Sequence, residues 1–355
     1  MLFLLLYLDS LEASRQQIGM IMGTASVGGV LMRPVVGWAL DTVGRKLTLS
    51  VGTLLTGCGL VCVWFIQGPD HVAYGVRLLF GVGVGAVFTG YFTFAADLIP
   101  ESRRTEGLAL FGISGLVPLF VNPLSARVGG APSDLRWFLP LMGVLVALSM
   151  IPLLMVKEPA RHSREPVRLK AVIAALKHRA LWSVWFATII FSSLAKTFMA
   201  FASVVAHNSA LAPAEDFWGT YALAAVSVRF FGARLPDRIG PSRLLIPALG
   251  TMVAAGVVLA SAGSYELLLV AGFLAGLGHG YAFPILSGQA VTRAPAPIRG
   301  SAMAMFTGLW EVSAITVPPL LGILADRHGD AAMLWVASGA AIVCLFGWHR
   351  LEYRR

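Results

Sequence analysis

The sequence predicts an all-α membrane protein made of two pseudo-symmetric six-helix bundles, with 11 full transmembrane helices and a remnant of helix 1. The first observation is composition: the 355 residues are 57% hydrophobic and only 13% charged, too few charges for a soluble surface. The second is a repeat at half-length. Residues 33–44 and 229–240 each place an Arg eight residues before an Asp and a Gly three residues after it. Such a repeat in apolar sequence is typical of membrane proteins built from two related bundles.

Apolar runs define the predicted spanning helices, because about 20 residues of helix cross roughly 30 Å of hydrocarbon. In chain order, the runs are residues 17–40, 47–67, 72–97, 105–127, 136–156, 180–206, 217–235, 244–263, 266–290, 300–324 and 332–349. Residues 1–8 are interpreted as the outer end of one more helix, too short to span a bilayer alone. A mis-set start codon, a fragment and a real truncation are all open explanations for that short first helix.

Basic residues predict the orientation of these helices. Of the 27 Lys and Arg residues, 19 lie at one set of helix junctions and only 4 at the opposite set. The richer junctions are near residues 41–46, 100–106, 157–179, 234–243 and 293–299 and at the C-terminus. We therefore expect these junctions and the C-terminus to face the cytoplasm, in a multi-pass protein of the inner membrane.

The longest polar connection, residues 157–179, divides the chain into an N-terminal bundle at 1–156 and a C-terminal bundle at 180–355. We interpret this segment as a basic cytoplasmic linker. Binding of a phosphoinositide or of a protein partner is the alternative, since basic cytoplasmic segments also serve that purpose.

Several other classes of protein are excluded. The net charge of +9 lies between apolar runs, so it reflects topology rather than nucleic-acid binding. Three scattered cysteines make neither a disulfide framework nor a metal site. No catalytic spacing, metal cluster or phosphate loop occurs, so we expect no enzyme, no metal and no cofactor. The expected partners are the lipid bilayer, a small-molecule substrate and protons, with the chain acting as a monomer.

Three motifs carry a resemblance to a known family. Residues 37–46, GWALDTVGRK, look like the motif G-x-L-a-D-R-x-G-R-K: the positions of Asp41, Gly44, Arg45 and Lys46 match, and Thr42 replaces the usual Arg. Residues 232–240, GARLPDRIG, echo the same motif. Arg77, followed by three alternate glycines, matches R-x-x-x-G-x-G-x-G. The chain therefore resembles the major facilitator superfamily, and in general character its bacterial efflux-type members. The resemblance covers all of the chain except the missing part of helix 1.

The resemblance implies a cytoplasmic gate in both bundles. In the family this motif forms a latch between the bundles, and its Asp accepts hydrogen bonds from an Arg or from a helix N-terminus. The alternative is a solvated turn in which Gly44 supplies a positive φ. The residues concerned are Gly37, Asp41, Gly44, Arg45, Lys46, Asp237, Arg238 and Gly240.

Ionisable residues inside predicted spans are costly and are therefore functional candidates. The resemblance gives Arg77 a role in proton coupling or substrate binding, and the alternative is an Arg that extends to the outer headgroups. Glu311 lies about 18 Å along its helix, near the middle of the membrane, where a carboxyl suits a proton carrier. Lys196 lies at similar depth and is able to pair with Glu311; a permanent ion pair is the alternative reading.

Arg33 and Arg229 occupy equivalent positions near the cytoplasmic ends of their helices, which favours a shared structural task over transport. His279 is either a packed or a functional histidine. It lies among glycines spaced for close helix packing, on helices that the resemblance places along the central cavity. These glycines are Gly81, Gly83, Gly85, Gly276, Gly278 and Gly280. The polar residues Tyr91, Asn122, Tyr221 and Tyr281 either contact substrate or hydrogen-bond within the core.

Together these patterns predict a secondary active transporter of a small organic solute that works by alternating access, with proton-coupled efflux by antiport as the preferred form. Import of a metabolite or an organic anion is the first alternative, favoured by the excess of buried Arg and Lys over acids. A transport-inactive scaffold or sensor is the second alternative. Most of helix 1 is missing from the sequence, and helix 1 lines the cavity in the family.

Overall fold

The computed structural model describes most of the chain, and every regular element among the described residues is a helix. The described residues are 3–98, 111–116, 119–120, 135–156, 169–211, 213–232, 234–295 and 298–353. The chain folds into two units. Unit 1 comprises Met1–Gly115 and Gly129–Pro166, and unit 2 comprises Leu116–Val128 and Val167–Arg355.

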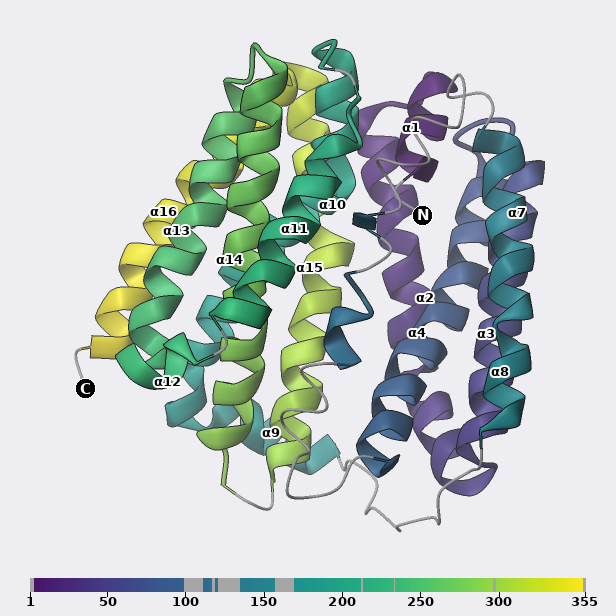
Figure 1. Cartoon of the computed structure of the whole chain (residues 1–355), viewed down its shortest axis with the longest axis horizontal. Helices are drawn as coiled ribbons and strands as arrows, with labels where there is room; N and C mark the ends of the chain where they lie inside the picture. The colour runs from purple at the N-terminus through teal and green to yellow at the C-terminus, as the bar shows by residue number, and fades with distance from the viewer. Residues whose placement is uncertain are drawn as a thin grey trace. The chain divides into compact units, whose positions relative to one another are not determined.

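In unit 1, α4 packs against both α2 and α3, and α7 packs on the far side of α3 (Figure 1). A short first helix, α1, contacts α2 and α7. The helices are α1 (Phe3–Ser10), α2 (Arg15–Thr42), α3 (Arg45–Val61), η1 (Cys62–Phe65), α4 (His71–Leu98), α7 (Leu135–Leu148) and α8 (Met150–Met155).

In unit 2, α14 packs against α11 and α13, while α10 packs against α15 and α16. Among the described long apolar helices, α10 is the most buried. The helices are α9 (Leu169–Lys177), η4 (Arg179–Leu181), α10 (Trp182–Asn208), α11 (Asp216–Phe231), α12 (Leu235–Ile239), α13 (Pro241–Ala260), α14 (Tyr265–Thr292), α15 (Arg299–His328) and α16 (Asp330–Tyr353).

Among the described residues, nine helices are long and apolar enough to cross a bilayer. They span Arg15–Leu40, Arg45–Phe65, His71–Tyr91, Arg136–Met155, Arg179–Asn208, Pro241–Ala260, Tyr265–Thr292, Ser301–His328 and Asp330–Tyr353. The prediction of an all-α membrane protein is confirmed. Of the two further predicted spans, most of 105–127 lies outside the described residues, and α11 has only 16 residues.

The two repeated motifs end in the same backbone geometry. Gly44 and Gly240 both have a positive φ, of 128° and 93°, and each is the residue immediately before a helix, α3 or α13. Residues with a side chain seldom adopt this conformation, so glycine allows the chain to reverse within one or two residues. The turn is therefore built in the same way in both halves of the chain.

Alternate glycines on α4 bring it close to two neighbours at once. Because residues four apart share a helix face, Gly81 and Gly85 face α2, whereas Gly83 faces α3. A Cβ at Gly81 would lie 1.9 Å from the Ala25 carbonyl oxygen, and one at Gly83 would lie 2.4 Å from the Thr56 nitrogen. These distances leave no room for a methyl group.

The glycines of α14 repeat this arrangement in unit 2. A Cβ at Gly276 would lie 2.0 Å from the Tyr221 carbonyl oxygen of α11, and one at Gly278 would lie 2.3 Å from the Ala248 carbonyl oxygen of α13. Gly280 returns to the α11 side, against Ala225 and Val228. The half-length repeat therefore reappears as the same three-helix contact in each unit.

Candidate functional site

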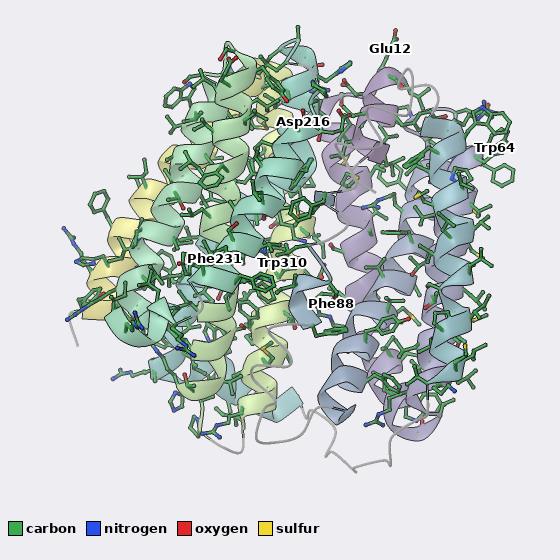
Figure 2. All side chains as sticks on the ribbon, in the orientation of Figure 1. Glu12, Trp64, Phe88, Asp216, Phe231 and Trp310 are labelled. Carbon is green, nitrogen blue, oxygen red and sulfur yellow. The ribbon has the colours of Figure 1, made fainter. Side chains whose placement is uncertain are left out.

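Aromatic rings from four helices of unit 2 surround His279 on α14. Phe191 of α10 and Trp310 of α15 lie edge-on to the His279 ring, with centroids 5.0 Å and 5.9 Å away. Phe283, one turn further along α14, stacks on His279 at 6.0 Å with an interplanar angle of 6°. Tyr221 of α11 completes the group, which we call the aromatic cluster; Trp310 is labelled in Figure 2.

A hydrogen bond fixes the orientation of the His279 ring. The Tyr221 hydroxyl lies 2.5 Å from His279 Nδ1, and both residues are buried. In neutral histidine one ring nitrogen donates and the other accepts, so either partner is able to donate here. The close contact of Gly276 with the Tyr221 backbone holds α11 and α14 together one turn away.

The aromatic cluster has a buried floor and a more accessible edge. Phe191, Tyr221 and His279 are buried, whereas Phe283 and Trp310 are only half-buried. Lys196 of α10 lies at this edge, also half-buried, with its ammonium nitrogen 4.3 Å from the centre of a Trp310 ring. A cation over an indole face is attracted by the ring quadrupole.

Glu311 follows Trp310 directly on α15 and is half-buried within the span Ser301–His328. A buried hydrogen bond of 2.6 Å between the Ser192 and Ser313 hydroxyls ties α10 to α15 close to this point. The structure therefore places Glu311 and Lys196 on two helices that are fastened together beside the aromatic cluster.

Arg229 lies on α11, half-buried, and near enough to Tyr221 and His279 for its charge to act on both. Tyr281 is half-buried on α14, and its hydroxyl occupies the space that a Cβ at Gly232 would need, 2.0 Å away. Tyr281 thus packs over the end of α11, while Tyr221 and His279 share a direct contact.

Arg77 lies in unit 1, where it is only 4% exposed. Its Nη2 donates to the Met22 carbonyl at 3.0 Å and its Nε to the Ile21 carbonyl at 3.4 Å, both on α2. The guanidinium also lies over the Phe80 ring, at 5.3 Å from its centre. Within the described part of the chain, Nη1 of Arg77 has no hydrogen-bond partner.

Two motif residues in unit 1 tie the start of α3 to the end of α2 and to α8. Arg45 is buried and donates from Nη1 to the Leu40 carbonyl at 2.7 Å, and Lys46 donates to the Leu154 carbonyl at 2.6 Å. Gly37 lies on α2, about two helical turns before Gly44. Arg238, in the second motif, is exposed. The side chains of Asp41 and Asp237 lie outside the described part of the structure.

The remaining predicted residues lie apart from the aromatic cluster. Tyr91 packs against Leu49, Phe94 and Leu153 in unit 1, and Arg33 is half-buried on α2. Asn122 lies outside the described residues. Neither Tyr91 nor Arg33 is in the unit that holds His279 and Lys196.

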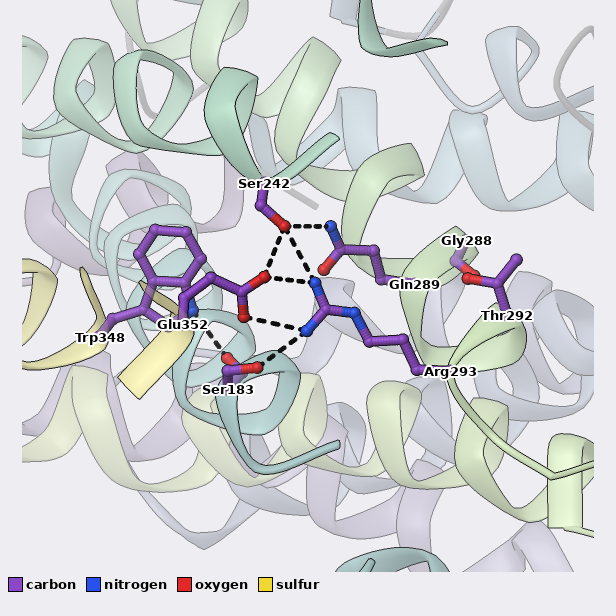
Figure 3. Close-up of polar contacts among 8 residues, drawn as sticks. All are labelled: Ser183, Ser242, Gly288, Gln289, Thr292, Arg293, Trp348 and Glu352. Carbon is purple, nitrogen blue, oxygen red and sulfur yellow. Dashed lines mark hydrogen bonds and ion pairs between the residues drawn. The ribbon is translucent and has the colours of Figure 1, made fainter. Parts of the chain in front are cut away.

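Sequence reasoning missed a polar network that joins four helix ends of unit 2 (Figure 3). Arg293, the residue after the end of α14, donates to both carboxylate oxygens of Glu352 of α16, at 2.9 Å and 2.5 Å, and to the hydroxyls of Ser183 and Ser242, each at 2.9 Å. Ser242 also donates to Glu352 at 2.6 Å and accepts from Gln289 at 3.1 Å. This network binds α14 and α16 to the first turns of α10 and α13.

Nothing in the sequence separated the network's Arg293 from the other basic residues at helix junctions. The aromatic partners Phe191, Phe283 and Trp310 were missed for a similar reason, because aromatic residues make up 10% of the chain. The one available signal was the position of Trp310 next to Glu311.

Comparison with known proteins gives a family match over nearly the whole chain. The model of the Major Facilitator Superfamily matches residues 1–213 and 218–355. The chain is 22% identical to the multidrug resistance protein MdtG of Salmonella arizonae, over 99% of this chain and 91% of that protein. It is 25% identical to the gentisate transporter of Corynebacterium glutamicum, over 88% of this chain and 73% of that protein.

A solved structure shares the fold. The crystal structure of the nucleoside transporter NupG superposes with a TM-score of 0.79 at 14% identity. The match covers 99% of this chain and 94% of that chain.

Proposed function

Because this chain belongs to the major facilitator superfamily, we propose that it exports a small organic compound across a bacterial inner membrane in exchange for protons. The chain is a multi-pass membrane transporter of small organic solutes and not an enzyme. Proton coupling, outward direction, a monomeric state and a cytoplasmic C-terminus are the parts that we add.

The observation that carries proton coupling is the carboxyl of Glu311, half-buried in the middle of a membrane span. A carboxyl in that position is expensive as a charge and much less so when protonated. The cost of charging it changes when its surroundings change. We propose that Glu311 carries the proton as the transporter alternates between its two states.

Arg77 is the second residue of the proposed coupling. It is a buried cation in unit 1, held by two backbone carbonyls and an aromatic ring. A buried arginine stays charged at neutral pH, so it keeps a positive potential in that unit throughout the cycle. We propose that this positive potential acts on the transported proton or attracts an anionic group on the substrate.

The motif junctions serve as the cytoplasmic gates in this proposal. Gly44 and Gly240 let their helices follow one another with almost no loop, and the Arg45 bond to the Leu40 carbonyl stiffens the first junction. Stiff junctions are suited to opening and closing as units during alternating access. The proposed Asp partners of this gate are Asp41 and Asp237.

The test uses purified protein in proteoliposomes that contain a pH-sensitive dye. Addition of a transported solute from a panel of organic compounds should move protons in the direction opposite to the solute. Glu311→Gln should reduce this flux by at least about tenfold, because it removes the carrier. The matched control is Glu266→Gln, which alters an exposed carboxyl in the first turn of α14 and should leave the flux unchanged. Undiminished flux in the Glu311 variant would remove Glu311 from the mechanism.

Uptake of an organic anion is the second candidate, favoured by Lys196 and Arg229 near the aromatic cluster. Similarity to the gentisate transporter supports it, as similarity to a multidrug resistance protein supports export. The sign of the proton flux separates the two: protons move with the solute in uptake and against it in export.

A further inference from the structure

The edge of the aromatic cluster suits one class of solute. Half-buried Lys196, Phe283 and Trp310 lie over a floor made by Phe191 and His279. We infer that this edge binds a planar aromatic compound that carries one negative charge. This inference rests on the proposed transport function, since it names the substrate of the same region, but it does not depend on the direction of transport.

The ring arrangement favours a flat aromatic guest. Phe283 and Trp310 meet at an interplanar angle of 88° with centroids 6.3 Å apart, and His279 and Trp310 meet at 86°. Rings at right angles offer a face on one side and an edge on the other. A planar aromatic ring is able to stack on one ring and meet the other edge to face, which adds to the gain from burying its area. A saturated ring of the same size gains binding free energy only from the burial of its apolar area.

Rigidity of the cluster supports a recognition role. Phe283 stacks on His279, His279 is held by Tyr221, and the glycine contact of Gly276 fixes the two helices behind them. The edge residues are therefore presented on a preformed surface, and binding costs little ordering of side chains.

The charges near the cluster favour an anion. Lys196 and Arg229 are cations, and Glu311 is the acidic residue next to Trp310. With Glu311 charged, these three residues carry one net positive charge, and with Glu311 protonated they carry two. This count holds whatever internal pairs the three residues form. Charge interactions are strong where water is scarce, so a monoanion is attracted whether or not Glu311 is charged.

An organic cation fits the same edge poorly. The half-buried Trp310 ring already has the Lys196 ammonium 4.3 Å from its centre. A second cation on that face would meet a like charge at close range, which is strongly unfavourable in an interface.

The experiment uses the purified full-length protein in nanodiscs and three probes of matched size: benzoate, cyclohexanecarboxylate and benzylamine. Binding is measured by saturation-transfer difference NMR, which detects weak ligands. Benzoate should bind about tenfold more tightly than either of the other probes, because only benzoate has both the ring and the negative charge. Equal binding of all three, tighter binding of benzylamine, or no binding of benzoate would overturn the inference.

Variants locate the binding to this edge. Lys196→Met should weaken benzoate binding about tenfold while Lys196→Arg should retain it, and Lys177→Met, on α9, is the matched control. Trp310→Leu should remove the preference for benzoate over cyclohexanecarboxylate, whereas Trp335→Leu, on an exposed position of α16, should not. Full benzoate affinity in Lys196→Met, or an equal loss in Lys177→Met, would contradict the site.

A transport arm separates this inference from the proposed function. Proton flux driven by cationic or saturated solutes, but not by aromatic anions, would leave proton-coupled transport standing and refute the substrate class. Selective benzoate binding with no proton flux for any solute would leave the binding site standing and refute the coupling.

Discussion

Replacing Gly276 by Ala tests how firmly the glycine contacts hold α14 against α11. A Cβ there would lie 2.0 Å from the Tyr221 carbonyl oxygen, and ordinary contact begins at 3.4 Å, so the helices must separate by about 1.4 Å. Overpacking costs roughly 1–3 kcal/mol, and the better helix propensity of Ala offsets about 1 kcal/mol. Because the opposing atom is backbone and cannot rotate away, we expect a net loss of about 2 kcal/mol.

Thermal unfolding in nanodiscs, followed by tryptophan fluorescence, measures this loss. A net loss of that size lowers Tm by roughly 4 °C. Gly288→Ala is the matched control on the same helix, because no atom lies within 4 Å of its added Cβ. That variant should keep or raise Tm through helix propensity alone. If the Ala variants at 276 and 288 unfold at the same temperature, the packing argument is wrong.

Two further predictions concern charged groups at helix ends of unit 2. Arg293→Met leaves the Glu352 carboxylate without its cation and should lower the free energy of unfolding by about 2–4 kcal/mol. Adding Glu352→Gln to this variant should recover part of that loss. Additive losses in thermal unfolding would argue against a coupled pair. Burial raises the pKa of Glu215 above its usual 4.5. The folded state therefore holds this proton more tightly than the unfolded state, and stability falls as pH rises from 4.5 through the raised pKa. Glu215→Gln should flatten that part of a plot of Tm against pH, and an unchanged slope would contradict the assignment.

Helix positions were predictable because hydropathy marks where the chain meets hydrocarbon. The run at 72–97 became α4, His71–Leu98, almost residue for residue. Prediction was weaker where a helix end is set by a glycine or by polar residues rather than by the edge of the apolar run. The α11 helix stops at Phe231 rather than at 235, because Gly232 follows it. The α15 helix continues four residues past 324 to His328, since polar residues can extend a helix beyond the membrane.

The candidate site was predictable only one residue at a time. Lys196 and His279 stood out as ionisable groups in apolar runs, but their partners are set by tertiary packing. Tyr221 and His279 are 58 residues apart in sequence, and Lys196 meets Trp310 across two helices. Arg293 and Glu352 are 59 residues apart and joined only by folding. A single sequence contains no signal for such pairs, because any of many side chains at the same depth would satisfy the same pattern.

The glycine turns at Gly44 and Gly240 have a mechanical consequence. Only Val43 and Gly44 separate α2 from α3, and Gly240 alone separates α12 from α13. A connection this short has no slack, so a shift of α2 along its axis is passed directly to α3. Each joined pair is therefore coupled at its junction. An epitope tag or protease site inserted at either glycine would break this coupling rather than report on it.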